Sequence, residues 1–106
     1  MPDDRLQVEV LPINAWFRVT PRPPYVVVSG PNRLPDTLIS IVGSKCAVID
    51  SDGIRLQGSI VDVEHFTPRV DVFGLLVEPK SAVDTDKELV CPAVIVIWRV
   101  ITNKGP

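Results

Sequence analysis

The segment from residue 45 to residue 78 constrains the fold most, because apolar and polar side chains alternate along it. Such period-2 alternation is typical of β-strands that bury one face. Asp52-Gly53 interrupts the alternation, and Asp-Gly between two alternating runs is a strong β-hairpin signal. We therefore expect Gly53 to have a positive φ angle at a tight turn. The apolar side chains that carry the alternation are Cys46, Val48, Ile54, Leu56 and Ile60.

The apolar positions within this segment change from even to odd numbers between Ile60 and Val61. A one-residue slip in a strand turns every later side chain to the opposite face of the sheet. An extra residue in one strand, a β-bulge, restores the correct face. The sequence therefore predicts a bulge between Gly58 and Val61.

Further short segments of the chain have strand character and are separated by Pro, Gly, Asn and Asp. In the first of these segments we expect Leu6, Val8 and Val10 to point inward. No window of about eleven residues has the 3.6-residue apolar period of a helix. Outside the double hairpin of 45–78, the segments with strand character are 5–11, 15–20, 25–28, 37–42 and 93–101.

The predicted fold is all-β: a small single-domain barrel or sandwich of about seven short, bulged antiparallel strands. One domain spans 1–106, with a polar loop at 80–90 and a polar tail at 102–106. A chain of 106 residues is long enough for one modest core. The net charge of −2 gives no global attraction to nucleic acid or to anionic membranes. The acidic start of the chain is followed by no signal-peptide core, so cytoplasmic synthesis is expected.

The sequence contains no recognisable catalytic or metal-binding constellation. His65 is the one histidine of the chain, and no nucleophile motif accompanies it. Cys46 and Cys91 are interpreted as buried free thiols, and one His with two distant Cys does not suit a structural zinc site. We therefore predict a protein that is not an enzyme and has neither a cofactor nor a metal site.

The last predicted strand, 93–101, is apolar on both faces until Arg99. A strand of this kind is central in a sheet or is covered on both sides. We predict that a partner covers one face and that Ile95, Ile97 and Ile101 contribute to the interface. The predicted function is a non-catalytic structural or interaction module that forms a homo-oligomer or docks in a larger protein assembly. An accessory component of a phage virion is one such setting, in which case the protein would be located in the virion.

An alternative prediction comes from the distribution of charge and aromatic residues. No acidic residue lies between Glu9 and Asp36, although this stretch holds arginines and aromatic residues. Arginines for phosphate contacts beside aromatic stacking faces are typical of single-stranded nucleic-acid binding, as in OB-type barrels. The residues predicted for that function are Trp16, Arg18, Arg22, Tyr25 and Arg33.

Overall fold

The computed structural model describes residues 3–13, 16–19, 25–30, 41–65, 73–84, 89–90 and 92–103. This part of the chain is all-β and contains no helix, which confirms the predicted fold class. Seven strands form one sheet, and every pair of neighbours is antiparallel. The strands are β1 (Asp3–Ile13), β2 (Trp16–Val19), β3 (Val26–Gly30), β4 (Lys45–Asp50), β5 (Gly53–His65), β6 (Phe73–Pro79) and β7 (Ala93–Asn103).

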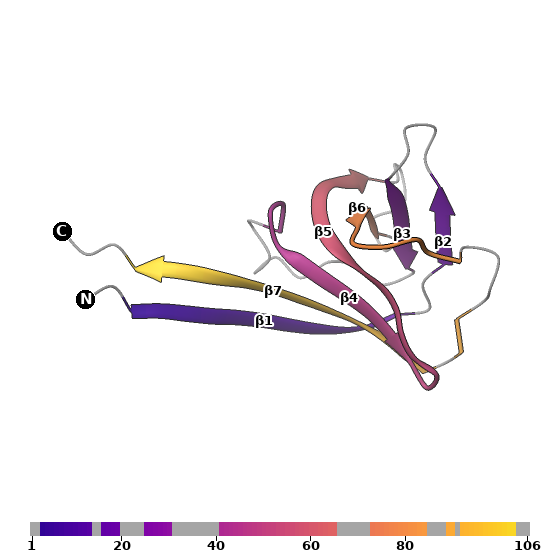
Figure 1. Ribbon diagram of the computed structural model, residues 1–106, viewed down its shortest axis with the longest axis horizontal. Helices are drawn as coiled ribbons and strands as arrows, with labels where there is room; N and C mark the ends of the chain where they lie inside the picture. The colour runs from indigo at the N-terminus through magenta and orange to yellow at the C-terminus, as the bar shows by residue number, and fades with distance from the viewer. Residues whose placement is uncertain are drawn as a thin grey trace.

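The strands follow one another across the sheet in the order β1-β7-β4-β5-β6-β3-β2. The sheet has two edges, β1 and β2, and does not close into a barrel (Figure 1). Three strands are longer than the predicted short ones, since β1 and β7 have 11 residues each and β5 has 13. Most of the strand predicted at 37–42 lies outside the described residues, whereas Ile41 and Val42 belong to no strand.

The long strand β5 bends, and the sheet turns back over itself around that bend (Figure 1). Its pairing with β6 shifts register between Ile60 and Asp62, which confirms the predicted bulge. A second shift, between Val48 and Ile49, lies in the β4–β5 hairpin. Bulges increase local twist and bend a strand, so they allow one sheet to provide both sides of a core.

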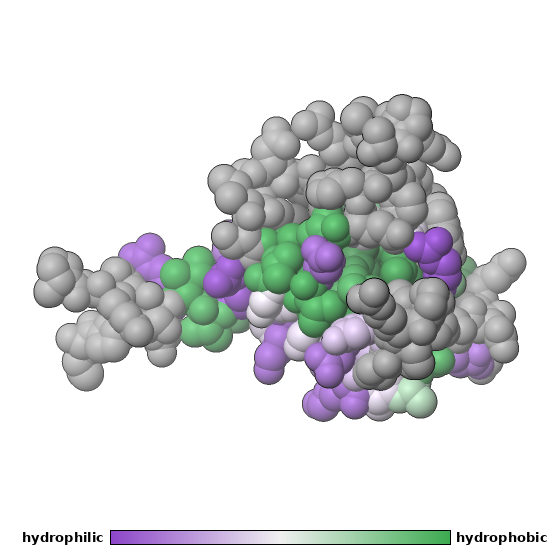
Figure 2. Space-filling model, turned by 90° about the horizontal axis from the view of Figure 1, so that it is seen from above, coloured by the Kyte–Doolittle hydropathy of each residue, from purple (hydrophilic) through white to green (hydrophobic). Residues whose placement is uncertain are grey.

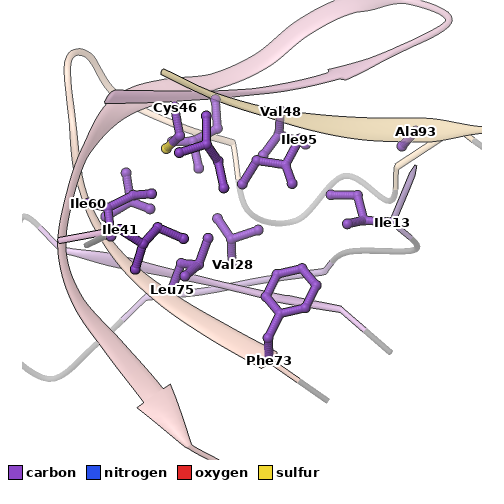
Figure 3. Close-up of a cluster of buried hydrophobic side chains, with 13 residues drawn as sticks. Ile13, Val28, Ile41, Cys46, Val48, Ile60, Phe73, Leu75, Ala93 and Ile95 are labelled. Atoms are coloured by element: carbon purple, nitrogen blue, oxygen red, sulfur yellow. The ribbon is translucent and has the colours of Figure 1, made fainter. Parts of the chain in front are cut away.

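The core lies between the two halves of the bent sheet. Side chains of β4 and β7 face side chains of β3 and β6, and Leu75, Val48 and Ile95 are fully buried there (Figure 3). The complete cluster consists of Ile13, Val28, Ile41, Cys46, Val48, Leu56, Ile60, Phe73, Leu75, Val77, Ala93, Ile95 and Ile97.

The turn between β4 and β5 is the Asp-Gly turn that the sequence predicts. Gly53 has a φ of 115°, which confirms its expected positive φ angle. A side chain at this backbone conformation is strained even though open space surrounds the position.

Replacing Gly53 with Val should lower the free energy of unfolding by about 1 kcal/mol or more, through backbone strain alone. Denaturant melts followed by circular dichroism measure this change. Ser51→Val is the matched control, because Ser51 lies in the same turn and its φ angle is not positive. Equal stability of the two variants would contradict the assigned strain at Gly53.

Candidate interaction surface

A two-stranded arm extends from the core and consists of the outer parts of β1 and β7 (Figure 1). The two strands pair from Ile13 with Ala93 at the inner end to Asp3 with Asn103 at the tip. On its other side β7 pairs with β4, but that pairing begins at Trp98 and covers only the inner half of β7. Among the described residues, the outer half of the arm therefore has no third strand. We call the paired segments Asp3–Gln7 and Arg99–Asn103 the arm.

One face of β1 and β7 carries apolar side chains from the arm toward the core. Directly opposite residues of an antiparallel pair share a face, and so do alternate residues of one strand. Leu6 lies opposite Val100, Val8 opposite Trp98 and Val10 opposite Val96. The outer apolar face is defined by these six residues: Leu6, Val8, Val10, Val96, Trp98 and Val100.

Most side chains of the outer apolar face are exposed to solvent although they are apolar. Leu6 is 63% exposed, Val10 56% and Val100 59%, while Val8 is 47% exposed. Large apolar side chains that cluster on a surface mark interaction sites more often than scattered ones do. Figure 2, a view of the molecule from above, shows apolar surface on the arm and in the middle of the molecule, with hydrophilic residues between the two.

The structure corrects the predicted direction of the β1 side chains. Leu6, Val8 and Val10 were expected to point inward, but they lie on the open face. The side of β1 that meets the core is the one that carries Leu11 and Ile13. The alternation in this strand predicts two faces correctly, but it does not say which face the core will cover.

The structure also changes the assignment of the predicted interface residues in β7. Ile95 and Ile97 are 0% and 3% exposed and belong to the core, so a partner cannot reach them while the fold is intact. Ile101 lies on the arm and is 43% exposed, on the face that it shares with Arg5. Its contribution to an interface stays a prediction.

Only three of the five residues predicted for nucleic-acid binding lie in the described part of the chain, so the structure does not show them as a single site. Trp16 and Arg18 lie in the edge strand β2, where Arg18 is exposed, and Tyr25 precedes β3 and is partly buried. Arg22 and Arg33 lie outside the described residues, so this function stays a prediction.

A hollow of about 440 Å³ adjoins the outer apolar face at Trp98. The register places Trp98, Lys45, Ser59 and Glu78 in one row across four neighbouring strands. The hollow carries side chains of both charges, since Lys45, Glu78 and Lys80 line it. It is lined by Lys45, Gln57, Gly58, Ser59, Glu78, Pro79, Lys80 and Trp98.

Asp50 is a buried acidic residue, and its carboxylate is fully occupied by structural contacts. Its Oδ2 accepts the backbone N–H of Val90 at 3.0 Å and pairs with Arg55 at 2.9 Å. Its Oδ1 accepts the N–H of Asp52 at 2.8 Å. The N–H of Val90 is the main cause that lowers the pKa of Asp50; Asp52 and Arg55 lower it further, and burial opposes them. This carboxylate ties the β4–β5 turn to the chain that leads into β7.

The structure offers little for catalysis or metal binding within its described part. Burial raises the pKa of Cys46 to about 12, so this thiol stays protonated and is a poor nucleophile. No group of three or more His, Cys, Asp or Glu residues is placed to hold a metal ion in the described ranges. His65 ends β5, and its side chain lies outside the described residues.

Comparisons with known proteins found no family model, no curated protein and no solved structure that matches this chain. Within the described residues, no helix is long and apolar enough to cross a membrane.

The charge on Asp50 should stabilise the fold at neutral pH and lose its effect in acid. Because its pKa is lower in the folded state, the stabilisation is present above the unfolded value of about 3.9. It is lost as the pH falls through the lower, folded value. Asp50→Asn should therefore lower the denaturant midpoint at neutral pH, and the difference from wild type should shrink below about pH 4.

Melts at a series of pH values measure this difference. Asp52→Asn serves as the control, because its side chain is 69% exposed and should change the midpoint little. A difference for Asp50→Asn that stays constant into strong acid would contradict the assigned role of the charge.

Proposed function

We propose that this protein is a non-catalytic interaction module that associates with other protein chains through the arm and its outer apolar face. The observation that carries the proposal is the exposure of Leu6, Val8, Val10 and Val100 on one face of β1 and β7, two strands that continue outward as a two-stranded arm. An isolated two-stranded ribbon is marginally stable in water, and three or more strands with a hydrophobic face are needed for independent stability. A further chain can supply the missing strands or pack against the apolar face.

The free energy expected from burying these side chains supports association, but not a strong complex. Fully burying one Val or Leu side chain is worth roughly 1.5–3 kcal/mol. Bringing two proteins together costs about 4–15 kcal/mol of lost freedom. The four side chains are already about half buried, so completing their burial offsets only part of that cost, and additional contacts are needed for a stable complex.

One apolar pair within the arm provides the test. Leu6 and Val100 lie opposite each other, and replacing both with Thr removes apolar surface while it keeps strand preference. Light scattering over a concentration series should show self-association of the wild-type chain. For Leu6→Thr/Val100→Thr the association should weaken by about tenfold or more, which corresponds to about 1.4 kcal/mol.

The control makes the same kind of substitution, from an exposed apolar residue to Thr, elsewhere on the surface. Ile54 is 61% exposed and Val42 is 49% exposed, and neither lies in β1 or β7. Ile54→Thr/Val42→Thr should leave the mass unchanged, and circular dichroism should show the same strand content for all three proteins. A wild-type chain that stays monomeric at the highest concentration would contradict the proposed self-association.

A further inference from the structure

The edge of β1 is the part of the arm best suited to pair with another strand. β1 is the first strand of the sheet order and pairs, among the described strands, with β7 alone. β1 has 11 residues, and between Asp3 and Leu11 alternate residues direct their backbone N–H and C=O groups away from β7, toward this outer edge. The opposite edge strand, β2, has only 4 residues. Long edges invite pairing with another chain, whereas short edges resist it.

We propose that two copies of this chain pair through β1, antiparallel, about a two-fold axis that passes between the two Gln7 residues. This inference rests on the proposed function and names the partner as a second copy. The pairing turns each two-stranded arm into half of a four-stranded sheet, β7-β1-β1-β7. It thereby supplies the additional strands that the arm lacks.

The position of the axis follows from the residues of β1. A two-fold axis normal to the sheet keeps each face on the same side in both copies, so an odd residue pairs with an odd one. With the axis at Gln7, Arg5 lies opposite Glu9 of the second copy, and Glu9 lies opposite Arg5. Both side chains are at least partly exposed. Opposite charges directly across two strands stabilise the pair.

The same register also matches apolar side chains. Leu6 lies opposite Val8 of the second copy, and each of the two is about half exposed or more in the single chain. The paired ladder then runs from Asp3 to Leu11 and ends one residue before Pro12. Proline has no N–H to donate, so a ladder that stops there loses no hydrogen bond.

The neighbouring registers fit less well. An axis at Leu6 places Glu9 opposite the acidic position 3, and like charges across two strands destabilise them. An axis at Val8 brings Pro12 into the ladder and places Glu9 opposite Gln7, so that it no longer meets Arg5. Of the three axis positions, only the one at Gln7 both places Arg5 opposite Glu9 and leaves Pro12 outside the ladder.

Charge reversal tests this register. Arg5→Glu places two acidic residues opposite each other at both ends of the interface, and Glu9→Arg places two basic ones. Each variant should weaken the dimer about tenfold or more in light scattering. The double variant R5E/E9R restores opposite charges and should recover the wild-type mass. An equimolar mixture of the two single variants should form a heterodimer. In it, the two acidic side chains of one variant, at positions 5 and 9, lie opposite the two basic side chains of the other.

Lys80→Glu is the matched control, since Lys80 is exposed and lies beyond the end of β6, outside the β1 edge. Its mass should equal that of the wild type.

A cysteine at the axis gives a second, independent measurement. Opposite residues in an antiparallel pair have Cα atoms about 4.5–5.5 Å apart, within the range that a disulfide spans. Gln7→Cys should therefore form a covalent dimer on mild oxidation, and a reductant should reverse it. Gln57→Cys, an exposed position on β5, and the wild-type chain with its own thiols are the controls and should stay uncrosslinked.

The outcomes separate this inference from the proposed function. If the wild-type chain associates but the charge reversals leave its mass unchanged and Gln7→Cys does not crosslink, the β1 pairing is overturned and association through the arm stands. If the wild-type chain is monomeric at every concentration, the β1 pairing and self-association through the arm are both overturned. Circular dichroism of each variant shows whether the strands remain, so a variant that fails to fold is recognised, and the crosslink then decides.

Discussion

The packing of β4 and β7 against β3 and β6 is the interaction on which the rest of the structure depends. One sheet provides both sides of this core, so it must bend, and β5, which bends in Figure 1, is also the strand whose pairing with β6 shifts register between Ile60 and Asp62. Small single cores leave little margin of stability. In this protein the two sides share one continuous hydrogen-bonded sheet, which fixes their relative position while leaving two edges open.

The arm follows from where that packing stops. β7 is held by β4 as far as Trp98 and by β1 as far as Asn103. The same strand is thus a core strand at its inner end and one half of a ribbon at its outer end. On the face that enters the core, Ile95 is fully buried, whereas Ile101 on the arm is 43% exposed. β7 is apolar on both faces: one contributes Ile95 and Ile97 to the core, and the other is part of the outer apolar face.

The contacts of Asp50 illustrate how the turn region supports this arrangement. The carboxylate accepts N–H groups from its own turn and from Val90, 40 positions away in the sequence. It therefore joins the β4–β5 hairpin to the segment from which β7 starts. No buried side-chain nitrogen or oxygen of the described residues is left without a hydrogen-bond partner, so the polar groups here are structural contacts that are already satisfied.

Much of the fold could be predicted from the sequence because its signals are local. The alternation around Asp52-Gly53 identifies a hairpin, since only a few residue types tolerate a positive φ angle. The change of phase after Ile60 locates the bulge, since side-chain direction in a strand has a period of two. The apolar character of 93–101 correctly indicates a strand with neighbours on both sides, which β1 and β4 provide.

The candidate interaction surface required the tertiary structure, and the reason is geometric. Alternation in β1 defines two faces, but the face that meets the core depends on strand order and register, which pair residues about 90 positions apart. For the same reason Ile95 and Ile97 lie in the core, whereas Leu6, Val8 and Val10 lie in the open. The sequence by itself determined the all-β class, the Asp-Gly turn and the bulge. Only the tertiary structure decided which apolar side chains remain exposed, because burial is set by contacts between strands that are distant in the chain.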